Sequence, residues 1–316
     1  MESILSIFNR IAPIIILLLI GKLLNRRQFL IPETIAEIKK LVVNIALPAI
    51  LFMSFLTMNI ELKYFWFVPL MLLIEISLFM IGTFLKQRLS VQGDYFPFLI
   101  TGFEYGMIGV SLFGAAYGIE NLGKIAIIDF GQELFVWFIY MALLTRKREG
   151  STNINSLVKM FITSPVILAI LSGILLNLSG LSHVLLETPF AGGLFSSIEL
   201  IGSLTVPLIL IVVGYGIQLD RSVLRYSLRV ILIRLCVLVP LAFLINRAFI
   251  VAWLQLGAGF QAAFFTLMIL PPPFILTLFM DQTLIEERHR IDNTLTLHTL
   301  VTIVVFIVYY AFNPQV

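Results

Sequence analysis

The sequence predicts an all-α polytopic membrane protein with ten transmembrane helices, arranged as two inverted five-helix repeats. Composition, ten long apolar runs and a match between the two halves of the chain predict this fold class. Hydrophobic residues make up 59% of the 316 residues and charged residues only 12%, whereas soluble domains carry roughly a quarter charged residues. The net charge of +3 gives no indication of nucleic-acid binding.

Ten apolar runs are long enough to span a bilayer. They cover approximately residues 4–24, 36–57, 65–85, 96–118, 124–144, 158–178, 193–217, 229–251, 260–280 and 294–312. No small-residue cleavage site follows the first run, so we expect a retained span and not a signal peptide. The longest polar link, residues 145–156, lies midway and divides one integral membrane domain into repeats 1–150 and 151–316.

The basic residues predict the orientation. All but four of the 21 Lys and Arg are assigned to the loops after odd-numbered spans, Arg234 among them. The four on the other side are Arg10, Lys63, Lys124 and Arg247. The positive-inside rule then makes the odd-numbered loops cytoplasmic and places both termini outside the cytoplasmic membrane. We expect no lysine or arginine deep in any span.

The two halves share a pattern. Residues 13–25 (PIIILLLIGKLLN) match residues 165–177 (PVILAILSGILLN), with proline, glycine and asparagine at the same spacing and an offset of 152. The second span of each half also agrees, around Pro48 and Pro207. Five spans in each repeat is an odd number, so the second repeat should be inverted relative to the first.

The ninth span contains three consecutive prolines, Pro271 to Pro273. They remove backbone donors and cannot lie in a continuous helix, and unsatisfied backbone must face protein or a water-filled cavity. The equivalent fourth span has Gly102, Gly106, Gly109 and Gly114, which break the helix, with the break expected at Gly106 and Gly109, or form a helix-packing face. We expect helices four and nine to be broken and to cross near mid-membrane, as in secondary transporters.

Residues 44–52 (NIALPAILF) and 201–210 (IGSLTVPLIL), followed by 214–219 (GYGIQL), resemble the auxin efflux carrier family. This family includes bacterial malate-type permeases and the plant PIN exporters. The resemblance covers the whole chain by span order, topology and loop lengths. It implies a ten-helix fold similar to the bile-acid and Na+/H+ antiporter carriers, with helices four and nine crossing and an organic anion as substrate. Tyr105 and Ser111 replace the amide and the proline usual in the family, so substrate choice is not carried over.

Acidic residues inside spans are costly and need a role. Glu75 lies centrally in the third span with no basic residue within a helical turn, and is either a proton carrier or a structural glutamate. The PIN exporters are similar in having an acid on this helix. Glu104, beside the carbonyls freed at the break, could bind Na+ or a proton, or lie at the interface. Glu133 shares a helical face with Gln132 and is a third candidate for cation coupling.

We expect half-helix N-termini at the crossing to favour an anion. The residues expected to bind it are Asn44, Tyr105, Gly106, Gly109, Ser111, Gln132, Pro271, Pro272 and Pro273. The predicted function is secondary active transport of a small organic carboxylate by alternating access, coupled to H+ or Na+. A non-transporting sensor or scaffold is the alternative. No catalytic motif or metal cluster is visible, so we expect neither an enzyme nor a cofactor. Membrane lipid is an expected partner, and the sequence is also compatible with a homodimer.

Overall fold

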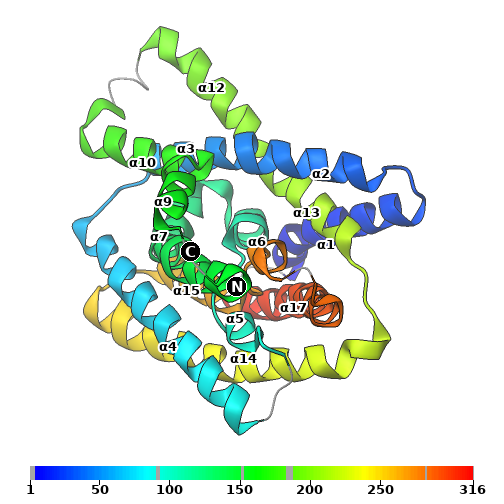
Figure 1. Cartoon of the computed structure of the whole chain (residues 1–316). Helices are drawn as coiled ribbons and strands as arrows, with labels where there is room; N and C mark the ends of the chain where they lie inside the picture. Colours follow the sequence, from blue (N-terminus) through cyan, green and yellow to red (C-terminus); the bar gives the residue numbers. More distant parts are fainter. Residues whose placement is uncertain (1–3, 90–92, 151–152, 183–187, 282, 316) are drawn as a thin grey trace.

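The computed structural model describes residues 4–89, 93–150, 153–182, 188–281 and 283–315, and the regular structure in these ranges is helical. In chain order the α-helices are α1 (Ile4–Arg26), α2 (Pro32–Leu41), α3 (Leu47–Thr57), α4 (Phe67–Arg88), α5 (Phe96–Ile100), α6 (Val110–Tyr117), α7 (Leu122–Phe135), α8 (Met141–Glu149), α9 (Ile154–Ile162), α10 (Pro165–Leu178), α12 (Pro189–Ser203), α13 (Thr205–Gly216), α14 (Leu224–Ile245), α15 (Ala258–Ile269), α16 (Ile275–Phe279) and α17 (Ile285–Phe312). Figure 1 shows α4, α14 and the α2–α3 pair around a centre that contains α6, α15 and α17.

Short π- and 3₁₀-helical segments continue or precede several of these helices. They are Val42–Ala46, Leu62–Trp66, Tyr105–Gly109, Ile119–Asn121, Val136–Tyr140, Arg221–Val223 and Asn246–Trp253. Several of them lengthen an adjoining α-helix to the span of a bilayer. For example, Asn246–Trp253 directly follows α14.

Eight segments of the described chain are long and apolar enough to cross a membrane. They are Phe8–Arg26, Pro32–Thr57, Leu62–Arg88, Phe96–Tyr117, Ile119–Glu149, Ala191–Gly216, Arg221–Trp253 and Ile285–Phe312. A ninth candidate is the pair α9 and α10, bent by 58° at a short break. The prediction of a polytopic helical membrane protein is therefore confirmed. The remaining run predicted at 260–280 contains α15 and α16, which are both too short to count as spans alone.

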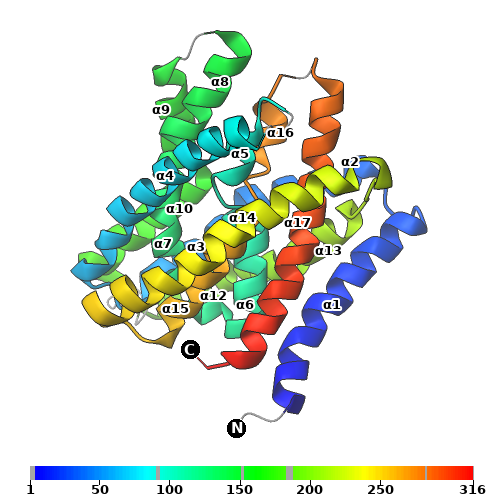
Figure 2. The same ribbon diagram turned by 90° about the horizontal axis from the view of Figure 1, so that it is seen from below.

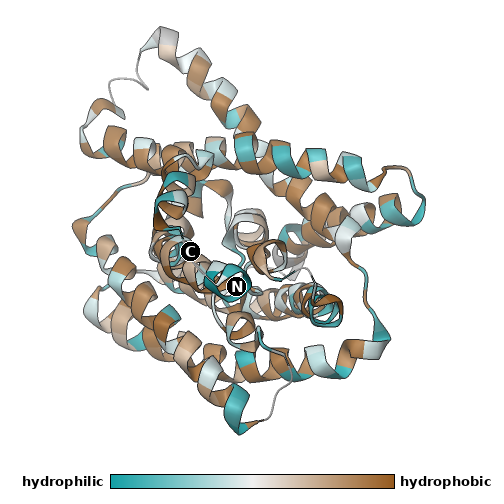
Figure 3. Ribbon diagram, in the orientation of Figure 1, coloured by the Kyte–Doolittle hydropathy of each residue, from teal (hydrophilic) through white to brown (hydrophobic). Residues whose placement is uncertain are grey.

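The outward faces of the helices are apolar, as contact with lipid requires. Leu73, Met80 and Phe84 of α4 are 65%, 67% and 56% exposed, and Leu232 and Leu244 of α14 are 61% and 64% exposed. Figure 3 shows hydrophobic residues along both helices. In Figure 2, the beginning of α1 and the end of α17 lie at the same end of the molecule.

The helix α1 packs closely against α13. The backbone of α13 at Ile211 approaches Gly21 so closely that no side chain would fit there, and Gly214 is equally close to the backbone of Leu18. At the end of this contact, Asn25 Nδ2 donates to the carbonyl oxygen of Tyr215, 2.6 Å away. An asparagine thus satisfies a carbonyl in the last turn of the partner helix.

A second helix contact, between α10 and α3, also combines a closely packed glycine with an asparagine that binds backbone carbonyls. A Cβ added to Gly173 would lie 2.9 Å from the carbonyl oxygen of Phe52. Asn177 Nδ2 donates to the carbonyl oxygens of Leu56, at 2.9 Å, and Met58, at 2.8 Å. The glycine and asparagine of the two matching segments therefore occupy similar surroundings. The predicted junction of the halves, at 150/151, borders residues 151–152, which lie outside the described residues.

Candidate functional site

The three prolines interrupt the helix as predicted. The helix α15 ends at Ile269, α16 begins at Ile275, and Pro271 to Pro273 lie buried between them. Since proline cannot donate a backbone hydrogen bond, the chain cannot continue the helical pattern here. Thr302 Oγ1 donates to the carbonyl oxygen of Ile269 at 2.7 Å and so satisfies one of the freed acceptors.

The fourth span is also interrupted, but at Gly102, the first of the four glycines considered in the sequence, and not at Gly106 and Gly109. The helix α5 ends at Ile100, and helical structure resumes with the π-helical segment Tyr105–Gly109. The break is therefore at residues 101–104, and the expectation of a break at Gly106 and Gly109 is wrong because both are helical. Gly102 has φ +76, and a Cβ there would lie 2.6 Å from Pro273 Cγ. A left-handed conformation and close contact with the other break both require glycine at this position.

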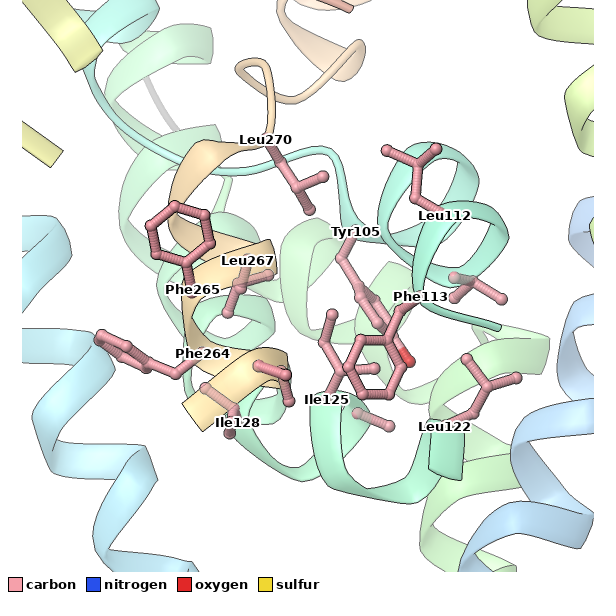
Figure 4. Close-up of a cluster of buried hydrophobic side chains, with 14 of the residues drawn as sticks. Tyr105, Leu112, Phe113, Leu122, Ile125, Ile128, Phe264, Phe265, Leu267 and Leu270 are labelled. Atoms are coloured by element: carbon pink, nitrogen blue, oxygen red, sulfur yellow. The ribbon is translucent and has the colours of Figure 1, made fainter. Parts of the chain in front are cut away.

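The two interruptions lie against each other, and we call this contact between residues 101–104 and 270–274 the crossing. The backbone N–H of Glu104 donates to the carbonyl oxygen of Pro271 at 2.8 Å. A Cβ on Gly109 would lie 2.9 Å from Leu270 Cδ1. Figure 4 shows Leu270 and Tyr105 on the two segments where they meet, above a packed hydrophobic cluster. The freed backbone groups of the two spans are thus partly paired with each other.

The carboxylate of Glu104 binds the N-terminal ends of both helical segments that follow the breaks. Its Oε2 accepts from the N–H of Phe274 at 2.7 Å, and its Oε1 accepts from the N–H of Met107 at 3.4 Å. Free N–H groups and the positive end of a helix dipole favour an anion here. The protein's own carboxylate therefore occupies the position where the sequence predicts a bound anion.

The opposite ends of the broken helices are bound by a cation, Arg234 of α14. Its guanidinium donates to the carbonyl oxygens of Leu99 at 3.1 Å, Leu270 at 3.2 Å and Gly102. It also lies over the ring of Phe103, 5.0 Å from the ring centroid. These carbonyls lie at or just beyond the C-terminal ends of α5 and α15, where orphan acceptors and the negative dipole end favour a cation.

Arg234 corrects two expectations. It was assigned to a cytoplasmic loop, and no basic residue was expected deep in a span, yet its side chain is 0% exposed. Two signals in the sequence could have identified it. Apolar residues flank Arg234 on both sides (residues 230–239, VILIRLCVLV), and Glu75 lacked a basic partner in its own helix. A buried charge needs compensation, so the two residues could have been considered together.

Glu75 lies on the same side of the crossing as Arg234. It is 0% exposed, and its Oε2 accepts from the N–H of Gly102 at 2.8 Å. Glu75 and Arg234 thus bind the N–H and the carbonyl of the same residue. His298, 1% exposed, is also buried in this part of the molecule, and neither of its ring nitrogens has a hydrogen-bond partner among the described residues. We call this group the buried side of the crossing.

A cavity of about 270 Å³ lies on the other side, which we call the open side. Its lining includes residues of α2, α7, α16 and both breaks, namely Lys39, Val43, Leu47, Phe103, Glu104, Tyr105, Gly106, Met107, Gln132, Glu133, Val136, Trp137, Ser164, Val166, Pro273, Phe274, Ile275 and Leu278. A neighbouring cavity of about 410 Å³ shares Lys39, Met107, Phe274 and Leu278 with it. Lys39, which the sequence analysis treated only as a topology signal, therefore lines both cavities.

Polar groups of α7 face the open side. Gln132 Nε2 donates to the carbonyl oxygen of Phe103 at 2.7 Å and to Asp129 Oδ1 at 2.9 Å, which leaves its Oε1 without a partner among the described residues. Glu133 Oε2 accepts from Trp137 Nε1 at 2.9 Å. Lys39 forms no ion pair with a described acid. The cavity lining thus includes one amino group and two carboxyl groups, from Lys39, Glu104 and Glu133, whereas Gln132 Oε1 is buried.

The structure brings part of the predicted site together. Six of the predicted residues line the 270 Å³ cavity, namely Glu104, Tyr105, Gly106, Gln132, Glu133 and Pro273. The ring of Tyr105 extends into the hydrophobic cluster beside Phe113 and Ile125 (Figure 4), and its hydroxyl has no partner among the described residues.

The other predicted residues lie elsewhere. Asn44 is exposed, and its Nδ2 donates to the carbonyl oxygen of Lys40 at 2.8 Å. Ser111 is buried and donates to the carbonyl oxygen of Met107 at 2.7 Å, within its own helical segment. Gly109, Pro271, Pro272 and Glu75 do not line this cavity.

No family model matches this chain, and no curated protein matches it significantly. Among the described residues, no group of three or more His, Cys, Asp or Glu is arranged to hold a metal ion. The groups that determine the chemistry of the site are thus those in the wall of the cavity beside the two interrupted spans, which contains acids and one lysine.

Proposed function

We propose that this protein is a secondary active transporter of a small organic anion, of the auxin efflux carrier type, that works by alternating access. The observation that best supports this proposal is the cavity of about 270 Å³ beside two interrupted spans that contact each other. Irregular backbone at membrane depth is tolerated where it lines a cavity or is buried in protein, and carriers bind substrates at such breaks.

Lys39 is the group best suited to bind the anion. It is the only basic residue in the lining of either cavity, and a carboxylate would pair with its ammonium. We therefore favour a small carboxylate as the substrate.

Glu133 is the best candidate for coupling. Glu104 is engaged by two backbone N–H groups at the breaks, and Glu75 binds Gly102 on the buried side. Among the described residues, Glu133 has only the indole of Trp137 as hydrogen-bond partner, and it lines the cavity. An ionised Glu133 would repel an anionic substrate, so binding of H+ or Na+ to it would favour substrate binding. This linkage would couple the two fluxes.

Similar contacts at α1–α13 and α10–α3 support an arrangement of two inverted repeats. Each contact combines a glycine that permits close approach with an asparagine that binds the partner helix. In each case a first span of one repeat packs against a second span of the other. The positive-inside rule supports a cytoplasmic membrane location with both termini outside.

The proposal is tested by uptake of labelled small carboxylates into proteoliposomes under imposed pH and Na+ gradients. We expect accumulation that requires one of the gradients. Lys39→Gln should weaken substrate binding by roughly tenfold, because a charge-assisted hydrogen bond contributes about 1.5 kcal/mol or more. Lys40→Gln is the matched control, since Lys40 is exposed and pairs with Glu37 at 2.7 Å.

Two results would count against the proposal. One is the absence of gradient-dependent flux for every carboxylate that stabilises the purified protein; binding without flux would favour the sensor. The other is equal binding by the Lys39 and Lys40 variants, which would remove Lys39 from the site.

A further inference from the structure

A separate groove runs along the outside of the molecule between α1, α17 and the link from α13 to α14. Its volume is about 720 Å³, and it shares no lining residue with the 270 Å³ cavity. Leu19 and Val304 in its walls are 58% and 62% exposed, so the groove opens to the surroundings of the protein. In Figure 2, α1 stands at the edge of the molecule beside α17.

The walls of the groove are apolar because each helix presents one face to it. Ile15, Leu18 and Leu19 of α1 and Ile303, Val304 and Ile307 of α17 lie three to four residues apart, which places each set on one side of its helix. The α1–α13 contact involves Gly21 and the backbone of Leu18, and Leu18 is buried, whereas Ile15 and Leu19 are 42% and 58% exposed. These two side chains of α1 are therefore available to another apolar molecule.

One end of the groove is basic. Lys22 continues the exposed face of α1, and Arg221 follows α13 at the beginning of the next span. Neither residue forms an ion pair with a described acid. Arg221 and Arg225, one turn apart, also line an adjoining hollow on α14. Asp220 lies at the same end, but His289 Nε2 is 2.8 Å from its Oδ2 and the N–H of Ser222 donates to its Oδ1.

We propose that this groove binds an anionic phospholipid, with the phosphate at Lys22 and Arg221 and an acyl chain along α1 and α17. Ile15 and Lys22 are seven residues apart on α1, which is about 10 Å along a helix. A charged end followed by an apolar slot of this length matches a headgroup followed by the first part of its acyl chain. The apolar walls would contribute nothing to the binding of free phosphate, so they favour a lipid. The basic end also lies on the side that the positive-inside rule assigns to the cytoplasm, where anionic lipid attracts Lys and Arg.

The test is native mass spectrometry and thermal unfolding of the full chain in detergent, titrated with phosphatidylglycerol, phosphatidylcholine or inorganic phosphate. We expect phosphatidylglycerol to bind and raise the melting temperature, and the other two to do neither. The double variant Lys22→Gln, Arg221→Gln should bind phosphatidylglycerol roughly 30-fold more weakly. The matched control is Arg10→Gln, Arg247→Gln, which removes the same charge from exposed positions outside the groove.

A second variant tests the apolar wall without changing a charge. Val304→Trp fills the groove at an exposed position and should reduce phosphatidylglycerol binding while the protein remains folded. The proposal is overturned if the Lys22 and Arg221 variant binds phosphatidylglycerol as tightly as its control. It is also overturned if phosphatidylcholine binds equally well, or if phosphate alone displaces the lipid. None of these outcomes depends on the transport proposal.

Discussion

The two sides of the crossing carry charges in different surroundings. On the buried side, Glu75 and Arg234 are fully enclosed and bind backbone atoms of the breaks. On the open side, Glu133 and Lys39 line a cavity, and each has much of its hydrogen-bonding capacity unused by the described residues. Glu104 combines the two roles, because it lines the cavity and also binds backbone N–H groups at the two breaks. The comparison teaches that a charge inside a span can replace missing helical hydrogen bonds or remain available to a ligand.

The largest expected effect is from removing the buried guanidinium. Arg234→Gln would leave carbonyls of Leu99, Gly102 and Leu270 without a donor, and we expect a loss of about 3–5 kcal/mol of stability. Thermal unfolding in detergent measures this, with the exposed Arg247→Gln as control. Equal melting temperatures for the two variants would show that the hydrogen bonds of Arg234 do not stabilise the breaks.

A smaller loss is expected from adding a methyl group at the crossing. Gly102→Ala would place a Cβ at φ +76 and against Pro273, with a cost of about 1–3 kcal/mol for the strained backbone alone. Gly216→Ala is the control, because nothing lies within 4 Å of the added carbon and its φ is ordinary. Equal melting temperatures for the two variants would contradict the close contact between the breaks.

The glutamates of the two sides should separate stability from function. The free energy of unfolding of Glu133→Gln should be within about 1 kcal/mol of the wild-type value, since an amide oxygen can keep the hydrogen bond from Trp137. Substrate uptake by this variant should no longer respond to an imposed gradient. Glu75→Gln should keep coupled uptake and lose some stability. Wild-type coupling in Glu133→Gln together with uncoupled flux in Glu75→Gln would reverse the assignment of the two sides.

The break in the ninth span could be predicted because proline acts locally. No tertiary contact is needed to show that residues 271–273 cannot donate helical hydrogen bonds. The fourth span contains several glycines that look alike in the sequence. Only the contact between Gly102 and Pro273, together with φ +76, distinguishes the one that breaks the helix. A glycine permits a break but does not require one, so its position depends on the partner segment.

The charged residues show the same limit. Arg234 was assigned to a loop because a basic residue usually marks one, but it lies in the middle of α14, and its burial follows from packing against residues 99–103 and 270. Lys39 belongs to the ten-residue helix α2, and only the tertiary structure places it beside two cavities. Residue type and spacing predicted that acids occur inside the spans. Which acid binds backbone and which faces the cavity depended on contacts between helices remote in sequence.

The smallest effect is expected from a solvated ion pair that serves as a reference for the buried side. Asp94, between the third and fourth spans, is hydrogen-bonded to Lys86 at 2.6 Å and lies 3.7 Å from Lys147, and both interactions lower its pKa below the ordinary 3.8. Because the folded-state pKa is the lower one, this contribution is complete above about pH 4 and is lost as the pH falls through the folded-state pKa. The side chain is 63% exposed, so solvent screens the pair and Asp94→Asn should cost less than about 1 kcal/mol at pH 7. The difference from wild type should shrink as the pH falls below about 4, and also in 1 M salt, when melting temperatures are compared. A salt-independent loss at pH 7 as large as that of Arg234→Gln would show that burial is not what distinguishes the charges at the crossing.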